Sequence, residues 1–205
     1  MKNLFLQLLI TISIFGLSGC SKDDAQTEAS KLPPETQTGA NTFGVTINGK
    51  VYIPRDPTGS LFGTSTHAIT FWTSPDGLHT FEELEVVDGK SAVGFQMIIH
   101  IQNLFTSGAG QYQLKKSNFH KGIDSDPLTH IYFKIWDANI SNYAYYGSIE
   151  NQGELNITRY DIPNRIASAN FKGKFVRYDN PDDLITITDG RFDIKWSTLD
   201  QTVFP

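Results

Sequence analysis

The sequence is poor in cysteine, in clusters of basic residues and in long apolar runs, and each shortage excludes a class of protein. Among 205 residues there is one cysteine, Cys20, so no disulfide can form within the chain. Lys and Arg form no cluster or stripe, which argues against charge-driven binding of nucleic acid or anionic lipid. No apolar run reaches the roughly 20 residues that a membrane-spanning helix needs. The fold must therefore rest on a hydrophobic core alone.

Familiar catalytic and ligand-binding motifs are missing as well. The sequence holds no Gly-x-Ser-x-Gly elbow, His-Glu-x-x-His pair, P-loop or dinucleotide glycine fingerprint. Its five histidines lack metal-ligand spacing, and His100 lies in an apolar segment, where we expect a hydrogen-bonded core residue. The five are His67, His79, His100, His120 and His130. We therefore expect no metal site, no cofactor and no enzymatic activity.

Carboxylates give two weaker signals. Glu83 and Glu85 are two residues apart on an expected strand, so their side chains share a face at about 6.6–7 Å. This is near the separation in inverting glycosidases, but any such pair has it, and a solvated strand face explains both acids. Residues 124–126 and 179–183 carry loop acids of the type that Ca²⁺ accepts. Turn formation by Asp and Asn side chains explains these two segments without a metal.

The N-terminus carries a signal for export and lipidation. Lys2 precedes an apolar segment over residues 4–17, the order typical of a secretory signal. Leu17-Ser18-Gly19-Cys20 then resembles the bacterial lipobox, which implies that Cys20 becomes the acylated first residue of the mature chain. We predict a signal peptide over residues 1–19 and a membrane partner that is reached through a lipid on Cys20.

Charged and polar residues follow the cysteine. Lys22, Asp23 and Asp24 resemble the surface-export signal of Bacteroidota lipoproteins, which implies an outer-membrane protein on the cell surface; a periplasm-facing position is the alternative. Residues 20–42 hold almost nothing apolar, so we predict a lipidated cysteine followed by a disordered tether. Without residues 1–19 the chain keeps 16 basic and 22 acidic residues, a net charge of −6.

Residues 43–205 are expected to form a single domain. Short segments rich in β-branched and aromatic residues alternate with Gly, Pro, Asn and Asp, and no window shows helical periodicity. This pattern predicts an all-β, antiparallel β-sandwich of roughly ten to twelve strands, with a lipocalin-like β-barrel as the alternative. Besides two hairpins, strands are expected at residues 67–73, 80–87, 93–103, 111–115, 129–137, 143–146, 154–160 and 166–177.

Two dipeptides predict hairpins with type I′ turns. Asn48-Gly49 and Asp189-Gly190 each separate two segments of strand-forming residues. At the second, a two-residue loop would pair Ile187 with Phe192, with the apolar residues on the core face.

Three longer patterns resemble uncharacterised Bacteroidota cell-envelope lipoprotein domains. They are Gly108-x-Gly110-x-Tyr112-x-Leu114, Gly153-Glu154-Leu155-Asn156-Ile157-Thr158 and Ile187-Thr188-Asp189-Gly190-Arg191-Phe192-Asp193. These are turn and strand residues, so the resemblance bears on the fold and implies no activity. The segment 166–171 departs from the family, which favours a Gly before its Phe.

Aromatic residues give the remaining functional signal. Strand alternation over residues 131–136 places Ile131, Phe133 and Ile135 on the core face and their neighbours on the opposite face. A short turn then leads to tyrosines on a strand that should pair with the first. Exposed rings beside a charge suit stacking on a sugar or peptide, unless a second layer covers them. The candidate ligand platform is Tyr132, Lys134, Trp136, Tyr143, Tyr145 and Tyr146.

These observations lead to one functional hypothesis and two alternatives. The hypothesis is a monomeric, lipid-anchored binding or structural module of the cell envelope, without enzymatic activity, that binds a glycan or peptide. A hydrolase acting on polysaccharide is the first alternative. A carrier of small apolar ligands is the second, if the sheet closes into a hollow barrel.

The lipid anchor gives the first testable prediction. Because Cys20 is the sole thiol and directly follows the lipobox residues, Cys20→Ala should abolish acylation and release or stall the precursor. Metabolic labelling with a fatty acid checks this, and label retained on the variant would contradict it.

Overall fold

The structure, a computed structural model, describes residues 31–57, 67–74, 80–90, 94–121 and 128–205. Cys20, Lys22, Asp23, Asp24, His79 and the acids at 124–126 lie outside these residues. The elements are β1 (Thr42–Ile47), β2 (Lys50–Tyr52), β3 (Ile69–Thr73), β4 (Phe81–Val87), β5 (Gln96–Gln102), α3 (Leu104–Ser107), β6 (Gly110–Gln113), β7 (His130–Asp137), β8 (Asn142–Asp161), β9 (Ile166–Arg177), β10 (Asn180–Lys195) and η1 (Leu199–Gln201). No helix among the described residues is long and apolar enough to cross a membrane.

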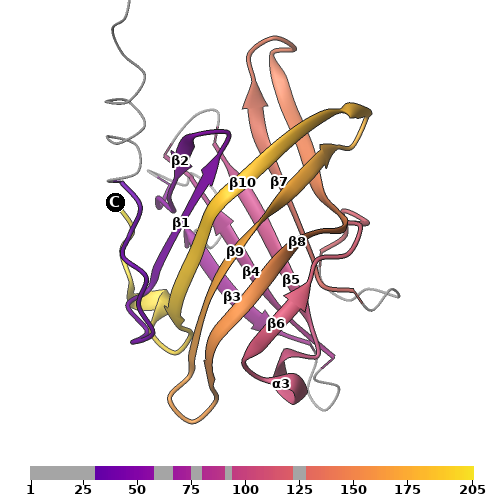
Figure 1. The fold of residues 1–205 in the computed structure, drawn as a ribbon. Coiled ribbons are helices and arrows are strands. Elements are labelled where there is room, and N and C mark those ends of the chain that lie inside the picture. Colours follow the sequence, from indigo (N-terminus) through magenta and orange to yellow (C-terminus); the bar gives the residue numbers. More distant parts are fainter. Residues whose placement is uncertain (1–30, 58–66, 75–79, 91–93, 122–127) are drawn as a thin grey trace, which may run out of the picture.

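All ten strands belong to one antiparallel sheet, which confirms the predicted fold class. The order is β2-β1-β10-β9-β8-β7-β5-β4-β3, with β6 added to β8. The sheet folds over on itself, so that β3, β4 and β5 lie behind β8, β9 and β10 in Figure 1. The two expected strands at 143–146 and 154–160 are parts of the single long strand β8.

The sheet bends at irregularities that the three long strands share. The pairing of β8 with β9 shifts between Ser148 and Gly153, and that of β10 with β9 shifts between Ile187 and Gly190. Between these shifts Gly153 faces Gly173, where a Cβ on Gly173 would lie 2.7 Å from the Gly153 Cα. Bulges increase local twist and bending, and paired glycines let the two backbones approach. This line of residues is the corner between the two layers.

The core fills the space between the layers. Leu84, Ile99 and Phe133 come from the strands on one side, and Phe43 and Phe171 come from the other. Aromatic rings pack across the interior, as in Phe133 and Phe175 with ring centroids 5.3 Å apart. Burying each large apolar side chain contributes about 1.5–3 kcal/mol, so this interior supplies the stability that no disulfide provides.

Over the described residues the sheet is not closed, so the barrel alternative is wrong. The hydrogen-bonded order ends at β2 on one side and at β3 on the other. Side chains span the gap: the Asp56 carboxylate accepts the backbone N–H groups of Ala68 and Phe204, each at 2.8 Å. An isolated bridge also joins Arg55 to Asp88. A carrier with a hollow barrel interior is therefore not supported by this fold.

The predicted hairpin at Asn48-Gly49 is confirmed. β1 pairs with β2 from Ile47–Lys50 to Val45–Tyr52. Asn48 has φ 45° and Gly49 has φ 83°, the positive values that a type I′ turn requires at both central positions.

The predicted hairpin at Asp189-Gly190 is wrong, because both residues lie inside the continuous strand β10. Ile187 pairs with Gly173 and Gly190 pairs with Phe171, so β10 carries one extra residue here, in a bulge. Ile187 and Phe192 are buried as expected, since the bulge shifts the inward alternation from odd to even positions. Gly190 serves close packing, because a Cβ there would lie 2.3 Å from the Phe171 ring.

The predicted tether is not free over its last residues. Residues 31–41 lie against the outer face of β1 and β10, and we call this segment the N-terminal strap. The Asp193 carboxylate holds it by accepting the Thr36 hydroxyl at 2.6 Å, and Ser168 donates to the same carboxylate from β9 at 2.7 Å. Three backbone N–H groups of the strap also donate to it, those of Thr38, Gly39 and Ala40. Composition indicated disorder, but one buried acid provides the partners that the strap backbone needs.

The contact between Gly190 and Phe171 gives a stability prediction. Gly190→Ala should lower the free energy of unfolding by about 1–3 kcal/mol through overpacking against the Phe171 ring. Phe171→Leu in the same chain should recover part of this loss, with a coupling of about 0.5–3 kcal/mol in a double-mutant cycle measured by denaturation. Strictly additive effects would contradict the close contact.

Candidate functional site

The structure brings most of the predicted platform together on the outer face of β7 and β8. The two strands pair as expected, with Lys134 opposite Tyr145 and Trp136 opposite Tyr143. Trp136 and Tyr143 make an edge-to-face contact with centroids 5.6 Å apart. The Lys134 Nζ lies 4.9 Å from the centre of the Tyr143 ring, within the range of a cation–π interaction. We call Lys134, Trp136, Tyr143 and Tyr145 the aromatic platform.

Tyr146 does not belong to this surface. It faces the core, where only 5% of it is exposed, and stacks on Phe133 with centroids 5.8 Å apart. Its hydroxyl donates to the Asp183 carboxylate at 3.1 Å. Burial, together with this bond to Asp183, raises the pKa of Tyr146 to about 12. Tyr145 and Tyr146 point to opposite faces because they are neighbours on one strand.

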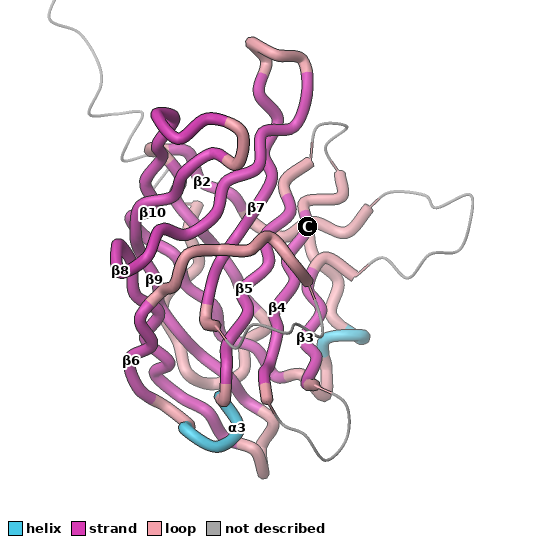
Figure 2. The backbone as a smooth tube through the Cα atoms, turned by 90° about the vertical axis from the view of Figure 1, so that its right-hand side faces the viewer, coloured by secondary structure: helices cyan, strands magenta, loops and turns pink. Residues whose placement is uncertain are grey.

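Tyr132 is at the covered end of the same face. The loop over residues 114–121 leaves β6 and crosses the outside of β7 and β5, as Figure 2 shows. The Phe119 ring lies 5.9 Å from the Tyr132 ring and rests on Gly147, where a Cβ would lie 2.5 Å from it. The loop therefore forms a second layer over Tyr132 and leaves Trp136 and Tyr145 open, with 39% and 46% of each exposed.

A buried row of polar side chains lies under this loop. Glu83 contacts the His100 Nδ1 at 3.0 Å, the His100 and His130 rings are 5.3 Å apart, and the Ser117 hydroxyl lies 2.9 Å from the His130 Nδ1. His100 is thus the hydrogen-bonded core residue that the sequence predicts. Glu83 is wholly buried, which corrects the expectation of a solvated Glu83–Glu85 face.

This row contains residue types that hydrolases use, Ser, His and Glu, but a substrate could not reach them. Ser117 is 5% exposed, and its hydroxyl accepts the Phe119 backbone N–H at 3.1 Å. A nucleophile must reach the substrate, and the loop that carries Ser117 also seals it. The row therefore holds the loop to the sheet. Sequence reasoning missed it because Ser117 comes from outside the strands.

A second buried acid lies on the inner face of β4. Glu82 accepts the Phe105 backbone N–H and the Tyr160 hydroxyl, each at 3.2 Å. Burial raises the pKa of Glu82 to about 7, although these hydrogen bonds oppose the rise. The sequence could have indicated this buried acid in one way only: Glu82 has the same parity as the core residues Leu84 and Val86 on the expected strand. Glu82 anchors α3 to the lower end of the core, a structural role.

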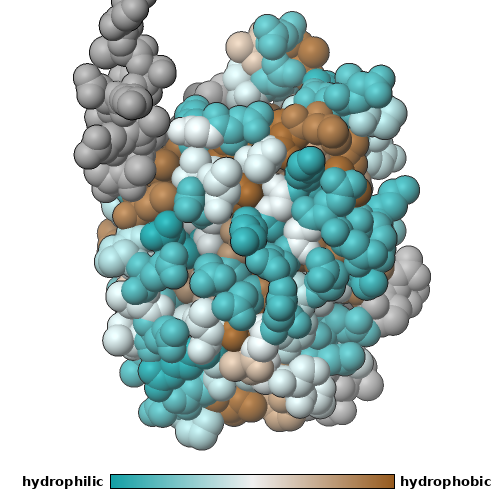
Figure 3. Space-filling view, viewed as in Figure 1, coloured by the Kyte–Doolittle hydropathy of each residue, from teal (hydrophilic) through white to brown (hydrophobic). Residues whose placement is uncertain are grey.

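The opposite face of the molecule is mainly polar. Figure 3 shows hydrophilic side chains over much of the surface formed by β8, β9, β10 and the N-terminal strap.

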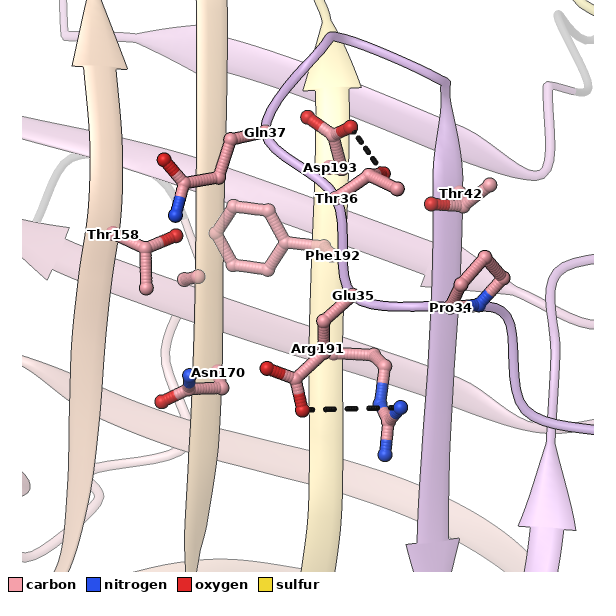
Figure 4. Close-up of a pocket in the computed structure, with 11 residues that line it drawn as sticks. Pro34, Glu35, Thr36, Gln37, Thr42, Thr158, Asn170, Arg191, Phe192 and Asp193 are labelled. Carbon is pink, nitrogen blue, oxygen red and sulfur yellow. Dashed lines mark hydrogen bonds and ion pairs between the residues drawn. The ribbon is translucent and has the colours of Figure 1, made fainter. Parts of the chain in front are cut away.

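A cavity of about 200 Å³ lies beside the strap (Figure 4). Hydrogen bonds from Thr36 and Ser168, aided by strap N–H groups, overcome burial and hold the pKa of the Asp193 carboxyl below its usual range. The Asp193 carboxylate beside this cavity is already used by the strap. We therefore assign it a structural role in holding the strap to the sheet.

Two of the acids at residues 179–183, Asp179 and Asp183, contact an arginine. Arg177 contacts Asp179 at 2.6 Å, and Asp137 and Asp183 at 3.3 Å each. Within the described residues, no group of three or more His, Cys, Asp or Glu side chains is arranged to hold a metal ion.

Glu82 gives a pH-dependent prediction. Its pKa is about 7 in the folded protein against 4.5 in a free side chain, so the unfolded chain ionises first as the pH rises. Between about pH 4.5 and 7 the wild type should lose up to about 2–3 kcal/mol relative to Glu82→Gln, with no further loss at higher pH. Denaturation across this range checks it, with exposed Glu150→Gln as the control. A constant difference between wild type and Glu82→Gln would contradict it.

Comparison with known proteins gives no information about the function of this chain. No family model, curated protein or solved structure matches this chain. The aromatic platform is thus the candidate functional site on physical grounds: it is the part of the outer face of β7 and β8 that the loop over residues 114–121 leaves open.

Proposed function

We propose that this chain is a lipid-anchored, non-enzymatic binding module of the bacterial cell envelope that holds a glycan on its aromatic platform. The anchor is the acylated Cys20, and Lys22, Asp23 and Asp24 direct the protein to the cell surface. The resemblance to Bacteroidota envelope lipoprotein domains supports this location. The proposal concerns a monomer with the ligand as its partner.

One observation carries the binding role. Trp136 is well exposed at the hairpin end of the outer face of β7 and β8, whereas the other end of this face is covered by the loop over residues 114–121. The Trp136 ring is kept in place by its edge-to-face contact with Tyr143, and Tyr145 extends the same surface. Rigid rings lose little conformational entropy on binding, and their flat faces suit stacking on a pyranose ring.

A glycan is favoured over a peptide by what this surface offers. The platform presents ring faces and one ammonium group, Lys134, from the hairpin end of the paired strands β7 and β8. Peptides that bind sheets commonly add a strand to an open edge, whereas the rings of the platform project from the face of β7 and β8. Stacking on exposed rings therefore fits the platform better than strand addition.

Substitution of Trp136 tests the proposal. Trp136→Ala should reduce binding on a glycan array by about tenfold or more while it changes the free energy of unfolding by less than about 1 kcal/mol. Its neighbour Phe133, which faces the core, should behave in the opposite way: Phe133→Ala should cost about 3–5 kcal/mol. Melting curves recorded beside the array separate the two effects.

Trp72 provides a matched control, because it is also 39% exposed but lies on β3. Trp72→Ala should leave glycan binding unchanged. The proposal fails if the wild type binds no glycan, if Trp72→Ala has the same effect as Trp136→Ala, or if Trp136→Ala unfolds the domain as severely as Phe133→Ala.

A further inference from the structure

A pocket of about 320 Å³ adjoins the aromatic platform at the unclosed side of the sheet. It lies between the edge strand β2, the residues Gly94 and Phe95 and the end of β7. Trp136 lines it and is also part of the platform, so the two surfaces are continuous. Its volume is at the lower end of the range of small-molecule pockets, so it suits one small group. The other lining residues that matter here are Lys31, Lys50, Tyr52, Arg55 and Asp88.

The charge of this pocket is opposite to that of the protein. Among the described residues that line it are Lys31, Lys50 and the Arg55–Asp88 ion pair, which leaves an excess of basic side chains. The chain as a whole carries a net charge of −5 at pH 7. A local excess of positive charge on an acidic protein creates a field that concentrates anions at that site.

The arginine in the pocket is held in a fixed orientation. Its Nε and Nη2 donate to the two Asp88 carboxylate oxygens at 2.7 and 2.5 Å. Backbone bonds on both sides of Arg55 fix the chain, from Arg55 N–H to the Val87 carbonyl at 3.2 Å and from Gly89 N–H to the Arg55 carbonyl at 2.8 Å. The Asp88 fork does not use Nη1, and this side chain remains 37% exposed. A preoriented guanidinium of this kind recognises carboxylates at low entropic cost.

Aromatic rings form the apolar wall. Tyr52 and Phe95 have ring centroids 5.0 Å apart, and the Lys50 Nζ lies 5.0 Å from the Tyr52 ring. Trp136 stands at the boundary with the platform. A ring stacked on Trp136 would thus have cations beside it, within the same small pocket.

We propose that the ligand is an acidic glycan, with a uronic acid ring on Trp136 and its carboxylate in the pocket near Lys50 and Arg55. This deepens the proposed function and rests on it. The carboxylate of a uronic acid is attached directly to the sugar ring, so one residue presents both groups that the pocket requires. An acidic peptide offers carboxylates without a sugar ring to stack on Trp136, and it therefore serves as a comparison in the test.

The experiment titrates the purified mature protein, which begins at Cys20, with defined oligomers. Trigalacturonate should bind at least about tenfold more tightly than its methyl ester or maltotriose, which lack the charge. Added salt should weaken the binding of trigalacturonate but not of the neutral oligomers. Lys50→Gln should weaken the binding of trigalacturonate about fivefold to tenfold and leave the ester unaffected, and Lys50→Arg should restore it.

Lys174→Gln is the control, because Lys174 is an exposed lysine on β9, away from this pocket. It should change nothing. Equal binding of trigalacturonate and its ester, both lost in Trp136→Ala, would overturn this inference and leave the proposed function standing. Binding of hexaglutamate or inorganic phosphate as tight as that of trigalacturonate would also overturn it. A wild type that binds no saccharide would refute the proposed function itself, and this inference with it.

Discussion

The architecture depends on the close approach of two backbones at the corner, where Gly153 on β8 faces Gly173 on β9. A side chain on either residue would collide with the other strand, with the Lys172 carbonyl or with Leu114. Bulges on β8 and β10 lie at the same level, so three long strands turn together and one sheet supplies both layers. Without this shared bend the inner residues of β4, β5 and β7 would have no opposite face to cover them.

The same corner determines which outer surfaces remain open. Where β8 leaves β7 it takes β6 as its new partner, and the chain after β6 must return across the outside of β7 and β5. Buried polar contacts, among them Ser117 with His130, hold that return segment in place. The loop covers one end of the face and stops short of Trp136. The aromatic platform is thus a consequence of topology, since the length and course of one connection decide what is exposed.

The sequence predicts the strands well and one of the two turns wrongly, for a clear physical reason. Inward positions change from odd to even across Asp189-Gly190, and both a two-residue hairpin and a single bulge produce that change. Local pattern cannot separate the two, because the difference lies in the partner: Phe171, from the neighbouring strand β9, occupies the space above Gly190. At Asn48-Gly49 the turn is local, and the dipeptide alone was sufficient.

In the candidate site, too, the residues that strand alternation places were predicted correctly, whereas contacts between residues far apart in the sequence were not predicted. Alternation and the short turn correctly placed Lys134, Trp136 and Tyr143 on one face, but Tyr146 joined the prediction through its position in a run of tyrosines. The features that sequence reasoning missed are made by residues far apart in the chain: Glu82 with Tyr160, Asp193 with the N-terminal strap, and Arg55 with Asp88. Each is an ionised or ionisable group whose partner becomes visible only when the sheet has folded over. The pocket beside Trp136 likewise exists only in the folded sheet, because it is lined by β2 and by the end of β7, which are far apart in the strand order.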